Sequence, residues 1–188
     1  ENLIKKNKNI YFLKPPINSK AKRINWVVKY FPYLLGEIIY VRDCGSISKN
    51  DCMEKMVSYF NDDTIAAVTS YGRVTIPHNF LSRSYSLGKS WINEIGRFRK
   101  NAQEKRKAVF VICGATTMFR KKVLTLYPIP STTKTEDTYY TWLLQRKGYF
   151  IRVADDAIVS ANDVDGNRLD GITRQIKQSY RWSSGTIQ

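Results

Sequence analysis

Asp43 is a carboxylate placed where ligands bind in layered α/β proteins. It follows a predicted buried strand at 37–42 and precedes the turn residues Cys44, Gly45 and Ser46. Ligands in such folds bind outside the carboxyl ends of the strands. A carboxylate at this edge can hold a divalent cation on a diphosphate. An aspartate that simply opens a turn would give the same local sequence.

Glu136 and Asp137 are adjacent carboxylates at the predicted start of a helix. Thr135 is expected to cap this helix, which runs to about Lys147 and is terminated by Gly148. The helix dipole favours anionic side chains in the first turn, which suits a base that accepts a proton from a hydroxyl. Helix capping alone would also account for these residues.

Gln178, Arg181 and Trp182 are spaced so that all three project from one face of a predicted helix at 169–182. Arginine can bind a diphosphate through two hydrogen bonds, tryptophan offers a flat surface for a sugar, and glutamine can orient hydroxyls. The alternative interpretation is an amphipathic helix with an interfacial Trp and a solvated Arg.

The composition limits the classes of protein that this chain can belong to. Its 188 residues are enough for one domain, and 31 Lys and Arg against 16 Asp and Glu give a net charge of +15. Such an excess favours polyanions, anionic membranes or phosphorylated substrates, although a solvated lysine-rich face is an equal alternative. The three cysteines show no CxxC spacing and are odd in number, and there is one histidine. This argues against a disulfide scaffold, a zinc site or a His-based triad.

Apolar runs and helical periodicity alternate along the chain, which predicts a single α/β domain over 1–188 with a mixed, mainly parallel sheet flanked by helices. Predicted strands are 10–13, 37–42, 65–69, 109–113, and the pair 150–153 and 158–160 around a turn at Asp155 and Asp156. Predicted helices are 19–30, 50–60, a long basic amphipathic helix within 73–107 that carries Leu87, Trp91, Ile95 and Phe98, 136–147, and 169–182.

Taken together and in order, these motifs resemble the processive family 2 glycosyltransferases, such as cellulose, hyaluronan and poly-N-acetylglucosamine synthases. The resemblance rests on Asp43, on Cys113 and Gly114, on Thr-Glu-Asp at 135–137, and on Gln-x-x-Arg-Trp at 178–182. It covers nearly the whole chain, from about residue 20 to residue 188. It implies a GT-A, Rossmann-like fold that is incomplete at its N-terminus, because the family's opening strand and base-reading Asp have no counterpart here.

The resemblance also implies a role for each matched position. Asp137, beside Glu136, would be the catalytic base, and Cys113 and Gly114 would line the acceptor site. The motif at 178–182 would bind acceptor and diphosphate. Lys20 begins a segment similar to the family's Lys-Ala-Gly-x-x-Asn motif and would meet the nucleotide-sugar, with Lys22 in place of the usual glycine.

The metal motif departs from the family pattern. Family members carry Asp-x-Asp, whereas this sequence reads Asp43, Cys44, Gly45. Two alternatives follow: either the affinity for Mg²⁺ or Mn²⁺ is weaker, or the metal ion relies on Asp43 and on the diphosphate of the donor. A literal Asp-x-Asp occurs at 163–165, before Gly166, and is interpreted as a turn.

The implied function is inverting transfer of a hexose from a UDP-sugar to a hydroxyl of a growing polysaccharide or other glycan. The enzyme would lie on the cytoplasmic face of the membrane, attached through segments outside this chain. Two alternatives are a catalytically inactive glycosyltransferase-like subunit, supported by Gly45, and a nucleic-acid-binding module, supported only by charge. Since no nucleic-acid motif is present, no nucleic-acid partner is expected.

Overall fold

The computed structural model describes residues 9–74, 80–133, 135–161, 177 and 180. The strands are β1 (Ile38–Arg42), β2 (Ser46–Ser48), β3 (Ile65–Val74), β4 (Thr116–Arg120) and β5 (Phe150–Ala161). The helices are α2 (Lys20–Tyr30), η1 (Pro32–Leu34), α3 (Cys52–Val57), α4 (Phe80–Lys105), α5 (Lys121–Leu126) and α6 (Glu136–Arg146). None of these helices is both long and apolar enough to cross a bilayer.

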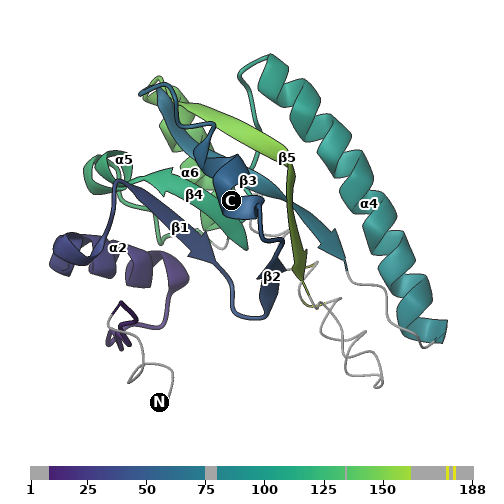
Figure 1. The fold of residues 1–188 in the computed structure, drawn as a ribbon, viewed down its shortest axis with the longest axis horizontal. Coiled ribbons are helices and arrows are strands. Elements are labelled where there is room, and N and C mark those ends of the chain that lie inside the picture. Colours follow the sequence, from purple (N-terminus) through teal and green to yellow (C-terminus); the bar gives the residue numbers. More distant parts are fainter. Residues whose placement is uncertain (1–8, 75–79, 134, 162–176, 178–179, 181–188) are drawn as a thin grey trace.

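The described strands form one mixed sheet in the order β1-β4-β3-β5-β2 (Figure 1). β3 and β5 pair in parallel, whereas β4 pairs antiparallel with both β1 and β3, and β2 pairs antiparallel with β5. Strands β1, β3 and β5 therefore run in one direction and β4 and β2 in the other. The predicted mixed α/β sheet flanked by helices is confirmed. Most of its strands run in the same direction, as predicted for a mainly parallel sheet, but most neighbouring strands pair antiparallel.

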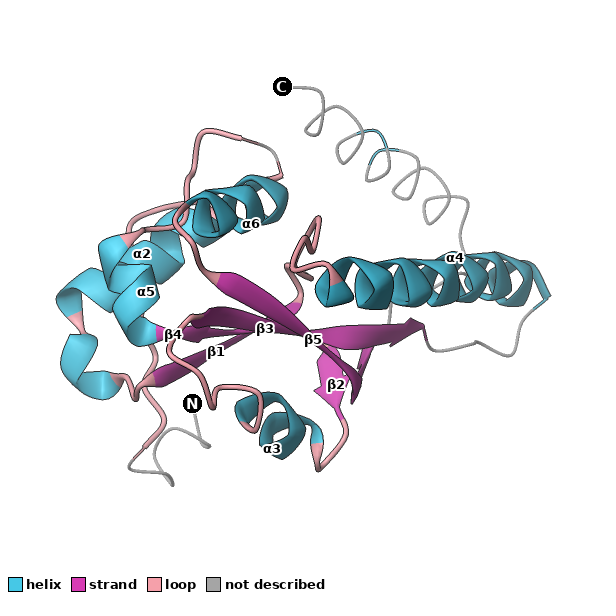
Figure 2. Ribbon diagram, turned by 90° about the horizontal axis from the view of Figure 1, so that it is seen from above, coloured by secondary structure: helices cyan, strands magenta, loops and turns pink. Residues whose placement is uncertain are grey.

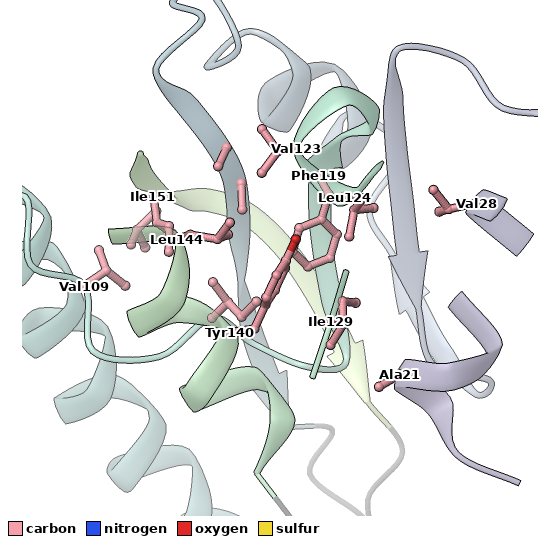
Figure 3. Close-up of a cluster of buried hydrophobic side chains, with 14 residues drawn as sticks. Ala21, Val28, Val109, Phe119, Val123, Leu124, Ile129, Tyr140, Leu144 and Ile151 are labelled. Atoms are coloured by element: carbon pink, nitrogen blue, oxygen red, sulfur yellow. The ribbon is translucent and has the colours of Figure 1, made fainter. Parts of the chain in front are cut away.

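Helices cover both faces of the sheet (Figure 2). On one face, α2, α5 and α6 enclose an apolar core in which the ring of Tyr140 packs 5.8 Å from that of Phe119 (Figure 3). Tyr140 also donates a hydrogen bond to the carbonyl oxygen of Tyr127 (2.7 Å). On the opposite face, Cys52 and Met56 of α3 are completely buried against the sheet. The first of these two cores contains Tyr140 and Leu144 and so fixes α6, and with it the carboxylates of its first turn.

Two of the predicted strands are wrong. Residues 10–13 form no strand, and Phe12 is 74% exposed, so this apolar run is not part of the core. Residues 109–113 form no strand either, because side chains rather than a neighbouring strand satisfy their backbone: Ile112 N donates to Thr141 Oγ1 (3.0 Å) and Cys113 N to Thr69 Oγ1 (2.8 Å).

The predicted pair of strands at 150–160 is also wrong, because β5 is a single continuous strand. Its partner β3 matches Ser70 with Ala154 and Tyr71 with Ile158, so the intervening residues of β5 form an irregularity in the ladder rather than a turn. The predicted helix that starts after Thr135 is confirmed, and Gly148 follows it with a φ of 83°, a conformation that favours glycine.

Candidate active site

Lys20, Asp43 and Gly114 meet where α2, β1 and the segment before β4 come together. Lys20 is the first residue of α2, and Asp43 follows the last residue of β1. The Lys20 ammonium donates hydrogen bonds both to Asp43 Oδ1 and to the carbonyl oxygen of Gly114. Asp43 N in turn donates to the carbonyl oxygen of Ala115 (2.9 Å). These contacts join three distant parts of the sequence at one point.

Asp137 approaches the same point from the first turn of α6. A Cβ placed on Gly114 would lie 3.0 Å from Asp137 Oδ2, so the glycine is what allows this approach. Asp137 Oδ1 accepts a hydrogen bond from the Thr138 backbone N–H (2.9 Å), which orients the carboxylate. Among the described residues, Oδ2 has no hydrogen-bond donor. It therefore lies beside Gly114 without a bound donor in this part of the chain.

The segment that carries Cys113 and Gly114 is fixed by three threonine hydroxyls that the sequence did not single out. Thr69 and Thr141 accept from backbone N–H groups of the segment, as described above, and Thr117 Oγ1 donates to the Cys113 carbonyl oxygen (2.7 Å). Thr141 also donates to the Asp137 carbonyl oxygen (2.7 Å). Thr141 thus bridges the segment and α6. The only sequence signal for this role is the position of Thr141 four residues after Asp137, one helical turn away.

A small cavity of about 30 Å³ lies beneath these groups, lined in part by Lys20, Gly114, Glu136 and Asp137. This volume is roughly that of one water molecule, so the cavity itself is too small to hold a sugar. Glu136 thus lies beside Asp137 at the same cavity.

A larger depression of about 290 Å³ lies elsewhere, between α3 and β5. Its lining includes Lys55 and Arg152, but both cations are already paired, Lys55 with Asp51 and Arg152 with Glu104. None of the predicted site residues that the structure describes lines it. We therefore assign the candidate site to the smaller cavity, where those residues converge.

Of the predicted site residues, the structure brings together Lys20, Asp43, Cys113, Gly114, Glu136 and Asp137. Gln178, Arg181 and Trp182 lie outside the described residues. In the part of the chain that the structure describes, no group of three or more His, Cys, Asp or Glu side chains is arranged to hold a metal ion. Asp43 is instead paired with the ammonium of Lys20.

Comparisons with known proteins identify the fold. No protein-family model matches the sequence, and no curated protein matches it at a significant level. Among solved structures, the chain is similar to the mannosyltransferase PcManGT from Pyrobaculum calidifontis in complex with GDP-Man and Mn²⁺, with a TM-score of 0.58 and 17% sequence identity. The match covers 80% of this chain, which spans 38% of the length of that protein. The predicted GT-A, Rossmann-like α/β fold is thereby confirmed.

Proposed function

We propose that this chain is the catalytic part of a glycosyltransferase that moves a sugar from a nucleotide-sugar to an acceptor hydroxyl with inversion. The observation that carries the proposal is the convergence of Lys20, Asp43 and Asp137 around Gly114. This places an available carboxylate oxygen near a cation and a second carboxylate. A glycosyltransferase needs these groups to deprotonate the acceptor and to bind the donor diphosphate. The fold shared with a mannosyltransferase supports the same reaction class.

In the proposed reaction, Asp137 Oδ2 accepts the proton of the acceptor hydroxyl as its oxygen attacks the anomeric carbon. The bond from that carbon to the donor diphosphate breaks, and the electron pair leaves with the diphosphate. Lys20 stabilises the negative charge that develops there, because an ammonium aimed at a leaving group stabilises the transition state more than the ground state. Glu136 is the carboxylate next to Asp137 in the site.

A divalent cation fits the site only together with the donor. Mg²⁺ and Mn²⁺ are commonly held by one or two carboxylates and by substrate phosphates, so Asp43 alone can suffice when a diphosphate is present. A bound metal ion would neutralise charge on that diphosphate. Lys20 contacts Asp43 in the structure, so this ion pair would have to break before a metal ion could bind the carboxylate.

The finer features of the proposal come from the sequence motifs. These motifs resemble processive family 2 enzymes, which supports a UDP-sugar donor, a glycan acceptor and a location on the cytoplasmic face of the membrane. The structural neighbour was determined with GDP-Man and Mn²⁺, so guanosine donors belong in any test beside uridine donors.

The experiment that tests the proposal is a donor screen. We expect the full chain to release nucleoside diphosphate from one member of a panel of UDP- and GDP-sugars with Mg²⁺ or Mn²⁺, and we expect EDTA to abolish this release. The Lys20–Asp43 ion pair favours one competing function, a catalytically inactive subunit that binds sugar or a partner. Binding of a donor without any turnover across the panel would establish that alternative.

Gly114→Ala is expected to lower the turnover number roughly ten-fold or more, because a misplaced catalytic group costs rate steeply. Its Cβ would lie 3.0 Å from Asp137 Oδ2, so the carboxylate must shift by a few tenths of an ångström. Steady-state transfer kinetics measure the effect. Gly96→Ala is the matched control, since a Cβ there meets no atom within 4 Å. Equal turnover in the two variants would contradict the placement of Asp137 as the base.

A further inference from the structure

Helix α4 packs on the sheet through its polar side. Tyr71 of β3 donates a hydrogen bond to Glu94, and Asn93 Nδ2 donates to the carbonyl oxygen of Gly72 (3.3 Å). Arg97 lies over the ring of Tyr71 (5.5 Å to its centroid). Burial, and then the hydrogen bond to Glu94, raise the pKa of Tyr71 to about 12, so this phenol stays a donor at neutral pH.

Further polar contacts continue along the same side of α4 toward its C-terminal end. Asp155 of β5 accepts a hydrogen bond from Asn101 Nδ2 (2.9 Å) and lies 3.6 Å from Arg97 Nη1. Arg152 of β5 pairs with Glu104. The usual arrangement of a surface helix, apolar side inward and polar side outward, is therefore reversed in α4.

The outward side of α4 is apolar. Its exposed large side chains are Leu87 (50% exposed), Trp91 (70%), Ile92 (67%), Ile95 (53%) and Phe98 (66%). The spacing of Leu87, Trp91, Ile95 and Phe98 follows the helical repeat, so they form one stripe along the helix rather than scattered exposures. Contiguous exposed apolar side chains of this kind mark a surface that another partner covers. We call these five residues the α4 apolar stripe.

The charges around the α4 apolar stripe are positive. Arg99 and Lys105 are exposed on the same helix, whereas its two acidic residues, Glu94 and Glu104, both pair with inward-facing partners. The chain as a whole carries a net charge of +15. Among the described residues, no acidic side chain pairs with Arg99 or Lys105. An outward surface that combines aromatic and aliphatic side chains with such cations complements an anionic lipid surface.

We propose that α4 binds the interface of an anionic bilayer, with the α4 apolar stripe inserted at the level of the headgroups and with Arg99 and Lys105 beside acidic lipids. A second copy of the chain is a poorer occupant. A two-fold symmetric contact would bring the same apolar stripe and the same cations together, and like charges at an interface are costly. This inference does not depend on the proposed transfer reaction, since none of the residues of the stripe lines the candidate site.

The test is sedimentation of the full chain with phosphatidylcholine vesicles, made with or without phosphatidylserine. We expect strong binding to the anionic vesicles, roughly ten-fold weaker binding to the neutral ones, and a decrease as salt is raised. The double variant Trp91→Ser, Phe98→Ser should lose roughly ten-fold or more of the partition coefficient on anionic vesicles. Bromine-labelled acyl chains should quench tryptophan fluorescence in the wild type far more than in this variant.

The matched control is the double variant Phe12→Ser, Tyr33→Ser, which removes two aromatic rings that are 74% and 76% exposed outside α4. Its vesicle binding should equal that of the wild type. Since all four side chains are exposed, circular dichroism should show both variants folded. The proposal is overturned if the wild type does not bind anionic vesicles, or if the α4 double variant binds them as well as the wild type. It is also overturned if lipid-free wild type sediments as a dimer that this variant converts to a monomer.

Discussion

Asp137→Asn is expected to lower the turnover number by about 10²–10⁴-fold, the usual contribution of a positioned general base, while donor affinity changes little. The substitution keeps the shape of the side chain, and its amide oxygen can still accept the hydrogen bond from Thr138 N. What is lost is the ability of the second oxygen, beside Gly114, to take a proton. Single-turnover transfer measures the rate of the reaction, and titration with the donor measures its affinity.

Asp63→Asn is the charge-matched control for this prediction. The Asp63 side chain is fully exposed and does not line the candidate site, and its partner is Arg120 at 3.3 Å. Its turnover should match that of the wild type. Turnover near the wild-type value in Asp137→Asn would exclude Asp137 as the base, and the same measurement on Glu136→Gln would then show whether the neighbouring carboxylate has that role.

The motifs grouped residues that lie together in space, whereas the hydrophobic pattern misplaced several strands. Asp43 and Asp137 were selected by residue type and context and Lys20 by the family resemblance, and the structure brings all three to Gly114. The apolar run 109–113 was predicted to be a strand, yet its backbone bonds to hydroxyls of distant threonines. The hydrophobic pattern indicates which residues are buried, but not which groups form hydrogen bonds with their backbone. It therefore could not distinguish a buried strand from a buried loop of this kind.

Two further features depend on tertiary contacts that no local pattern encodes. The ion pair between Lys20 and Asp43 joins residues whose separate motifs gave no sign of direct contact. The orientation of α4 was also beyond prediction, because its amphipathic pattern alone favours an apolar side that faces the sheet. Tyr71 and Asp155, which bind the polar side of α4, decide the orientation.

Lys20→Met is expected to lower kcat/KM roughly 10²–10³-fold, the loss typical when one preorganised donor to developing negative charge is removed. Its effect on folding should be small, because Lys20 and Asp43 are partly exposed, and exposed ion pairs contribute about 1 kcal/mol or less. A large loss of activity with an unchanged free energy of unfolding therefore separates a role in the reaction from a role in stability. Transfer kinetics and urea denaturation of the same variant provide both values.

The same variant also tests whether Lys20 competes with a metal ion. With the ammonium removed, Asp43 loses its cationic partner, so the concentration of Mn²⁺ that gives half-maximal residual activity should fall. Lys22→Met removes an equal charge from an exposed position of α2 and should leave both the activity and the Mn²⁺ requirement unchanged. An unaltered Mn²⁺ requirement in Lys20→Met would mean that Asp43 does not bind the metal. Equal activity in the two lysine variants would mean that Lys20 does not reach the donor.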